Sequence, residues 1–194
     1  FVATGINGAQ IFDVGRPESP TFLGHVSIGV GATEYEDLIL GDELLYGATF
    51  DGIEFVDVSP ALTLMKQVEP SYLIQFNNVF SYDKRSDLAL DANSLYLAER
   101  VHAVNRLHPF GHHRSISLSL FESTNLAQRI GRVTLFSDGL IDRTTPKSIS
   151  VDVADMAAFV AQENLIWHVD VSNRLEPSIV ASKSLDGTTF EEIK

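Results

Sequence analysis

The stretch "DGIEFVDV" at residues 51 to 58 recurs in related form in two other places along the chain. The copies are "NGAQIFDV" at 7 to 14 and "NLIWHVDV" at 164 to 171. Each copy begins with a polar turn, continues as a short apolar run and ends in Asp-Val. Recurrence of one segment at intervals is the mark of a repeat architecture, so we interpret this stretch as a building unit and not as an isolated site.

The similarity extends backwards from each copy into a second apolar run. The extended copies are "FVATGINGAQIFDV" (1 to 14), "LYGATFDGIEFVDV" (45 to 58) and "AFVAQENLIWHVDV" (158 to 171), with a weaker copy, "LYLAERVHAVNRL" (95 to 107), in which Asn105 replaces the Asp. A period of roughly 40 to 50 residues in a strand-rich chain is typical of propeller blades. Turn residues divide each unit into four short strands. The sequence therefore predicts an all-β fold, a β-propeller of four-stranded blades with about four repeats, as a closed small ring or a segment of a larger propeller.

Both faces of the repeated strand carry apolar residues. In the central copy Ile53 and Phe55 lie on one face, while Val56 and Val58 lie on the other. Because successive side chains of a strand point to opposite faces, this strand is expected to be covered on both, as in a blade between two neighbours.

Two segments have helical character. Residues 151 to 164 have a helix-forming composition, but the repeat alignment assigns them to two strands. Residues 123 to 130 are expected to form one short helical turn, with Ser123 or Thr124 as its cap.

The domain prediction is a single propeller domain, or part of one, over residues 1 to 194. Residues 108 to 147 do not match the repeat and are expected to be an insertion. The first unit lacks an inner strand, and "GTTFEEIK" at 187 to 194 resembles the start of one. Either these ends complete one blade, which would hide exposed sheet edges, or missing residues or other chains complete the ring.

The strand ends "FDVGRPESP" (12 to 20) and "VDVSNRLEP" (169 to 177) resemble those of the LVIVD-repeat family of β-propellers. The resemblance implies a propeller fold and a secreted or cell-surface location. It supplies no catalytic residues, because the family shares none.

Composition excludes several kinds of partner and chemistry. The formal net charge is −12 at pH 7, so nucleic acid and anionic membrane surfaces would be repelled. No cysteine is present, which excludes disulfides, thiol catalysis and Cys-ligated zinc. No apolar run is long enough to span a bilayer in this segment. A protein or a surface polymer is the expected partner.

The recurring Asp13, Asp57 and Asp170 have two interpretations. They could be cation ligands around a channel. Alternatively, each carboxylate accepts backbone N–H groups of the turn that follows the strand, as Asp commonly does. We favour the structural interpretation.

The densest polar segment is "HAVNRLHPFGHHR" at 102 to 114. Its imidazoles could bind a metal such as Zn²⁺, but their spacing fits no zinc motif and two arginines lie among them. We expect a contact surface instead, with four candidate binding residues: His102, His108, His112 and His113. The lone Trp167 is a further candidate, facing a ligand or packing between blades.

Acidic turns leave room for a bound divalent cation. Asp83, Asp87 and Asp91 are the candidate metal ligands for Ca²⁺ as a cofactor, or for Mg²⁺, although no EF-hand spacing is present. Otherwise we expect no cofactor.

The predicted function is a non-enzymatic binding or scaffold module of a secreted or cell-surface protein. The alternative is a metal-dependent hydrolase or lactonase-like propeller with its site at the central channel. No P-loop, nucleophile elbow or dinucleotide loop followed by a helix occurs. Ligands drawn from several blades would leave no motif, so enzymatic activity stays open.

Overall fold

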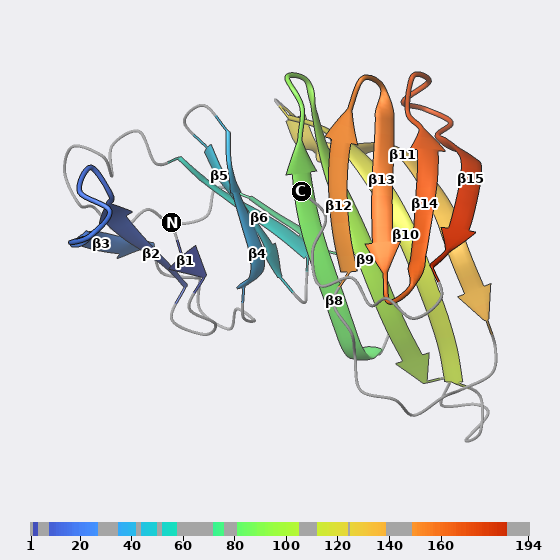
Figure 1. Cartoon of the computed structure of the whole chain (residues 1–194), viewed down its shortest axis with the longest axis horizontal. Helices are drawn as coiled ribbons and strands as arrows, with labels where there is room; N and C mark the ends of the chain where they lie inside the picture. The colour runs from blue at the N-terminus through green and yellow to red at the C-terminus, as the bar shows by residue number, and fades with distance from the viewer. Residues whose placement is uncertain are drawn as a thin grey trace. The chain divides into compact units, whose positions relative to one another are not determined.

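The computed structural model describes residues 2–3, 8–26, 35–41, 44–49, 52–57, 72–75, 81–104, 112–123, 125–138 and 149–185. These residues form an all-β structure of four antiparallel sheets and contain no helix (Figure 1). The chain divides into two compact units, Phe1–Phe76 and Asn77–Lys194, called unit one and unit two below. The prediction of an all-β chain is confirmed.

Unit one contains two sheets. The first has three strands in the order β1 (Val2–Ala3), β2 (Ala9–Asp13) and β3 (Thr21–Val26). The second has four strands in the order β4 (Tyr35–Leu40), β5 (Leu44–Thr49), β6 (Gly52–Asp57) and β7 (Tyr72–Gln75).

Unit two also contains two sheets, each of four strands joined in sequence order. One comprises β8 (Ser81–Leu90), β9 (Ser94–Val104), β10 (His112–Glu122) and β11 (Asn125–Asp138). The other comprises β12 (Ile149–Ala154), β13 (Ala157–Gln162), β14 (Leu165–Asp170) and β15 (Ser178–Ser184).

The repeat seen in the sequence is reproduced in the strand pairing. Tyr46 of β5 pairs with Phe55, and Phe159 at the same repeat position of β13 pairs with His168. The first hairpin matches too, because Leu40 pairs with Leu45 as Val153 pairs with Ala158. The repeat units are therefore equivalent in register as well as in sequence.

The connection from third to fourth strand is also repeated. Asp13 Oδ1 accepts a hydrogen bond from Gly15 N, and Asp170 Oδ1 accepts one from Ser172 N, each at 2.8 Å. A one-residue register shift follows at matching positions, after Ile11 in β2 and after His168 in β14. The recurring Asp thus fixes a turn in two copies; the side chain of Asp57 lies outside the described residues.

The segment with helical composition forms strands. Residues 151 to 164 contribute to β12 and β13, joined by a two-residue turn. Asp155 and Met156 in this turn have φ angles of 48° and 66°. Left-handed angles at both central residues suit a tight hairpin, so a turn of the I′ kind interrupts what composition alone would make a helix.

Two expectations about local structure are wrong. Residues 125 to 130, expected in a helical turn, begin β11, because pairing with β10 outweighs local preference. The weak copy at 95 to 107 was expected to hold two strands, but β9 runs unbroken to Val104. Asn105 lies outside the described residues. The segment 108 to 147 supplies β10 and β11, the third and fourth strands of their sheet.

Each sheet has two faces, which we name by position in the repeat. The leading face is the one that carries Gln10 in β2, Val56 in β6 and Trp167 in β14. The trailing face is the opposite face of each sheet, and it carries the residues that alternate with these along each strand. In unit one the trailing face of β1–β3 (Ala9, Ile11) packs on the leading face of β4–β7 (Leu45, Val56). In unit two the trailing face of β8–β11 packs on the leading face of β12–β15. Both units thus pack their sheets in the same sense.

Burial on both faces, expected for every repeat, holds for β4–β7. Leu45 and Val56 on its leading face and Tyr46 and Ile53 on its trailing face are all buried. The sheet β12–β15 differs, because Phe159, Ile166 and His168 on its trailing face are only partly buried.

Candidate functional site

The turn between β8 and β9 is built around the carboxylate of Asp91. Its Oδ1 accepts hydrogen bonds from Asn93 N at 2.8 Å and Ser94 N at 2.7 Å. Its Oδ2 accepts one from the Tyr96 hydroxyl at 2.7 Å. Both oxygens of this candidate metal ligand are therefore engaged in holding the turn.

These contacts change the acidity of both partners. Burial alone would raise the pKa of Asp91, but the hydrogen bonds from Asn93, Tyr96 and Ser94 and the charge of Arg174 together lower that pKa. Burial, followed by the hydrogen bond to Asp91, raises the pKa of Tyr96 to about 12. At neutral pH, Asp91 is therefore a charged carboxylate that accepts a hydrogen bond from the neutral hydroxyl of Tyr96.

Arg174 belongs to the turn between β14 and β15, which lies against β11. A side chain at Gly131 of β11 would collide with the carbonyl oxygen of Arg174 and approach the ring of Pro177. Only glycine allows this close approach. The Asp91 turn, Gly131 and the Arg174 turn therefore join the two sheets of unit two at one end.

Asp87 joins the same two sheets near their first strands. Its Oδ2 accepts a hydrogen bond of 2.6 Å from Val151 N in β12. β12 is the edge strand of its sheet, and on such a strand every second backbone N–H points away from the neighbouring strand. The N–H of Val151 is directed at Asp87 instead. The Asp87 carboxylate satisfies that donor.

The sheet brings two of the predicted residues together with two others in one cross-strand row. Asp83 pairs with His102, His102 with Arg114, and Arg114 with Asp138, which places all four on the trailing face of β8–β11. We call this set the charged row. The neighbouring row contains Arg85 paired with Arg100.

The other predicted histidines lie elsewhere. His113 pairs with Ala103, and His112 pairs with Val104 at the end of the β9–β10 ladder. His108 lies outside the described residues. His113 is thus on the opposite face of the sheet from His102. Trp167, 4% exposed, packs in the core between the two sheets, the packing role that its sequence position also allowed.

A set of buried polar residues was not predicted. Thr49, Glu99 and Gln162 occupy the same position of the second strand in three sheets and are all buried. Beside Glu99 in its row stands Ser117, whose hydroxyl oxygen lies 3.0 Å from Arg132 Nη2. The repeat alignment contained this signal, because it places a polar residue at this position in three of its four copies, with Gly5 in the first.

A second unpredicted pair lies in unit one. The buried Tyr35 hydroxyl donates a hydrogen bond of 2.9 Å to Glu54 Oε2. Burial is the largest cause that raises the pKa of Tyr35, followed by the charge of Glu54. Gly47, paired opposite Glu54, leaves the space that the Tyr35 ring occupies.

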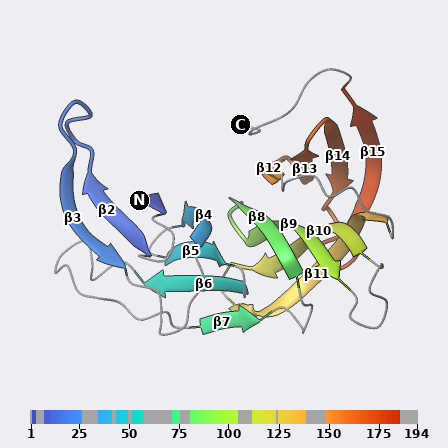
Figure 2. The same ribbon diagram turned by 90° about the horizontal axis from the view of Figure 1, so that it is seen from below.

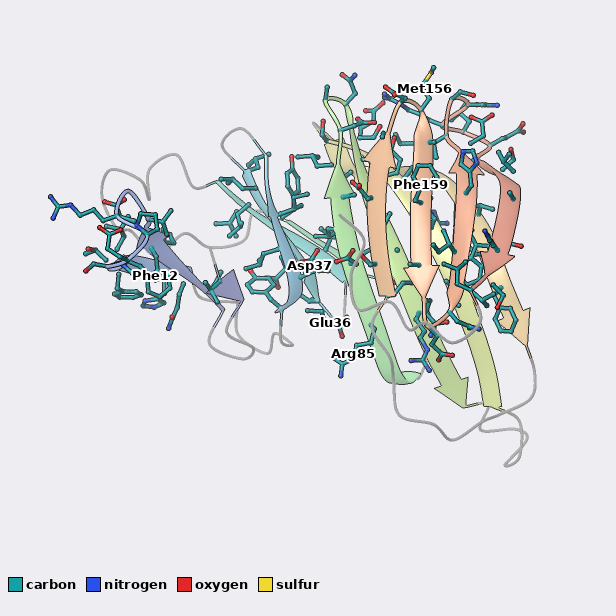
Figure 3. All side chains as sticks on the ribbon, viewed as in Figure 1. Phe12, Glu36, Asp37, Arg85, Met156 and Phe159 are labelled. Atoms are coloured by element: carbon teal, nitrogen blue, oxygen red, sulfur yellow. The ribbon has the colours of Figure 1, made fainter. Side chains whose placement is uncertain are left out.

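The trailing face of β12–β15 carries an aromatic stack. Phe159 of β13 is labelled in Figure 3. Its ring stacks on the imidazole of His168 in β14, with ring centroids 5.0 Å apart and an angle of 14° between the ring planes. Ile166 is next to them on the same face, and all three side chains are partly exposed.

In the part of the chain that the structure describes, no three His, Asp or Glu side chains gather as metal ligands would. Those same residues include no helix of the length and apolar character needed to cross a membrane.

Comparison with known proteins gives no family. The sequence matches no family model, and no curated protein is similar to it. Among solved structures, the chain resembles the computationally designed Ika8 protein at 8% identity and a TM-score of 0.46, with 99% of this chain and 61% of that chain covered. A hypothetical selenium-binding protein from Sulfolobus tokodaii aligns at 11% identity and a TM-score of 0.41, over 92% of this chain and 57% of that one. Apo AztD from Citrobacter koseri aligns at 9% identity and a TM-score of 0.25, over 88% and 76% of the two chains. The chain thus spans about three fifths of the first two proteins.

Proposed function

We propose that this chain is a non-enzymatic binding or scaffold module built from propeller blades. The observation that carries the proposal is the repeated packing of a trailing face on the next leading face in both units. In unit two the contact is extensive between the first strands, β8 and β12, and slight between the last, β11 and β15 (Figure 2). In a propeller, neighbouring blades also lie close together at their first strands and spread apart towards their last strands.

The use of the carboxylates supports a scaffold over a hydrolase. Asp13, Asp170 and Asp91 each accept backbone N–H groups of their own turns, and Asp87 accepts that of Val151. Carboxylates that are held in this way stabilise turns and sheet contacts. Their recurrence is explained by the repeat and needs no shared ligand.

The charged row is the surface we propose for a partner. The strand pairing brings residues of both charge signs, Asp83, His102, Arg114 and Asp138, to adjacent positions of one row, which suits a protein or surface polymer that also carries both. A secreted or cell-surface location belongs to the same proposal, and it rests on the resemblance of the strand ends.

One experiment separates the scaffold from the hydrolase. Purified protein is dialysed against a chelator, its metal content is measured before and after, and both samples are assayed on a panel of esters and lactones. The proposal predicts no stoichiometric metal and no turnover in either sample. Tightly held metal together with turnover that is lost on chelation would contradict it.

A second experiment addresses the partner. Binding to an immobilised zwitterionic polysaccharide is compared for the unmodified protein, Arg114→Ser and the control Arg129→Ser, an exposed arginine of β11 outside the charged row. The proposal predicts weaker binding only for Arg114→Ser.

A further inference from the structure

The hairpin turn between β12 and β13 holds Met156 in a backbone conformation that suits glycine. Its φ angle is 66°, in the left-handed region that residues with a side chain rarely adopt. The side chain is 71% exposed, and Figure 3 shows it projecting beyond the ends of the strands. A strained residue whose side chain lies largely in solvent points to a role outside the packing of the fold.

A second exposed apolar side chain belongs to the turn between β14 and β15. Leu175 is 70% exposed. Within this turn Glu176 N donates a hydrogen bond of 3.1 Å to Asn173 O, and the equivalent bond closes the same turn in the first repeat. There the position of Leu175 is taken by Glu18, which is also exposed. The turn therefore forms without a leucine.

Both apolar residues depart from the repeat in the same way. Met156 stands where the second repeat has Glu43, and Leu175 stands where the first repeat has Glu18. Both lie in turns and not on a sheet face, so the packing of sheet on sheet in the two units does not involve them. Exposed apolar side chains at positions that are otherwise charged indicate an interaction surface.

The two turns lie at the same end of unit two. Val171 N, at the start of the second turn, donates a hydrogen bond of 3.0 Å to Met156 O in the first. The turn between β8 and β9 is at this end as well, because Arg174 is close enough to Asp91 for its charge to lower the pKa of that carboxyl. We call these three segments, residues 90–94, 154–157 and 170–178, the turn end.

The turn end carries a surplus of negative charge. Asp155 and Glu176 are exposed and directly adjoin the two apolar residues in sequence, and Asp170 is partly exposed. Arg174 is the basic residue of these segments, and its charge acts on Asp91. A partner that complements this surface is therefore both apolar and basic.

We propose that the turn end of unit two binds a polypeptide segment of a partner protein in which apolar side chains alternate with basic ones. Methionine suits such a surface, because its flexible and polarisable side chain adapts to the apolar groups that it meets. The carboxylates attract lysine and arginine and oppose anionic lipid. The charged row lies at the opposite end of β8 and β9, so this contact does not depend on it.

The test follows the fluorescence anisotropy of a labelled peptide of alternating leucine and lysine as the unmodified chain is added. Saturable binding is expected. A peptide of alternating serine and lysine keeps the charge but lacks the apolar groups, and one of alternating leucine and glutamate reverses the charge. Each is expected to bind at least about tenfold more weakly.

Two substitutions separate binding from folding. Met156→Gly should raise the melting temperature, because glycine adopts a positive φ without strain, and should weaken binding of the leucine and lysine peptide by about tenfold. Leu175→Gln should leave the melting temperature unchanged and weaken binding to a similar extent. Phe22→Ser is the control, since it removes a side chain that is 51% exposed from unit one, and it should bind as the unmodified chain does.

The NMR signal of the Met156 methyl group reports on the site without any substitution. It is identified by its loss in Met156→Gly, and it should shift when the leucine and lysine peptide is added to the unmodified chain. The proposal is overturned if this signal does not move, or if both variants bind that peptide as tightly as Phe22→Ser. It is equally overturned if the serine and lysine peptide binds as tightly, because charge alone would then suffice, or if the chain binds phosphatidylcholine vesicles and none of the peptides.

Discussion

Asp87 of β8 and Val151 of β12 are joined by a hydrogen bond of 2.6 Å from the Val151 backbone N–H to the Asp87 carboxylate. The bond crosses from one sheet to the other and satisfies a donor on the edge of β12. Removing the acceptor by Asp87→Ala leaves that donor unpaired beside the core, so the free energy of unfolding should fall by about 1 to 3 kcal/mol. Asp87→Asn keeps an acceptor oxygen and should lose less. Urea unfolding of both variants measures the difference, and equal loss would show that the carbonyl-type acceptor is not what matters.

Acid should act on unit two through Asp91. The folded-state pKa of this carboxyl lies below its ordinary value of 3.8, so its contribution to stability is present at neutral pH and is lost as pH falls below 3.8 through the lowered pKa. Asp91→Ala should destabilise the protein by about 1 kcal/mol at pH 7, as loss of a capping residue does, and by less in acid. Urea unfolding is measured at pH 7 and at a pH below the ordinary carboxyl pKa of 3.8. Asp155→Asn, in an exposed hairpin turn, is the control. A loss that is the same at both pH values would contradict the assignment.

Alkali should act through Tyr96. Its pKa in the folded protein is raised from 10.0 to about 12, so the folded state holds the phenol proton more tightly than the unfolded state. The resulting stability is fully present below pH 10 and is lost as pH rises from 10 towards 12. Tyr96→Phe should be less stable at pH 7 by about 1 kcal/mol, and its deficit should shrink across that window. Thermal melting of both proteins at several alkaline pH values gives the comparison; a constant deficit would exclude this proton linkage.

Gly131 should tolerate no side chain. Gly131→Ala would force its methyl group against the backbone of Arg174, so the turn between β14 and β15 must move, at a cost of about 1 to 3 kcal/mol. Thr134→Ala, at an exposed position of the same strand, is the matched control and should be nearly neutral. The single Trp167, buried between the two sheets of unit two, provides the fluorescence signal for unfolding. Equal stability of the two variants would mean that the turn between β14 and β15 can move without a cost in free energy.

The repeated Asp should depend on its oxygen and not on its charge. Asp170→Ala removes the acceptor for Ser172 N and should lower the melting temperature, whereas Asp170→Asn should retain most of the turn because the amide oxygen can accept the same bond. The pair Asp13→Ala and Asp13→Asn offers the same comparison in the first repeat. Similar melting temperatures for the Ala and Asn variants would contradict the turn-fixing role.

Sequence periodicity was sufficient to predict the segments that repeat. "DGIEFVDV" and its copies were expected to be strands with a turn-fixing Asp, and β2, β6 and β14 occupy these positions. The helix-like composition of 151 to 164 was overruled correctly, because an alignment with two other copies carries information on pairing that local propensity lacks. The prediction failed where the repeat is weak, at β9 and at the start of β11, since there only contact with β10 decides the conformation.

The chain by itself determined its repeat, its all-β class and the chemistry of the strand ends, because these follow from residue types at short sequence separation. Tertiary structure alone decided which distant residues meet. The contacts of Asp87 with Val151 and of the Arg174 turn with Gly131 depend on how the sheets stack. The pairing of Asp83 with His102, and of His102 with Arg114, depends on how the strands align. So does the difference between a covered Val171 and an exposed Val14, which are the same residue at the same position of the repeat. Val171 is buried because the neighbouring sheet of unit two packs on it, which its own repeat cannot reveal.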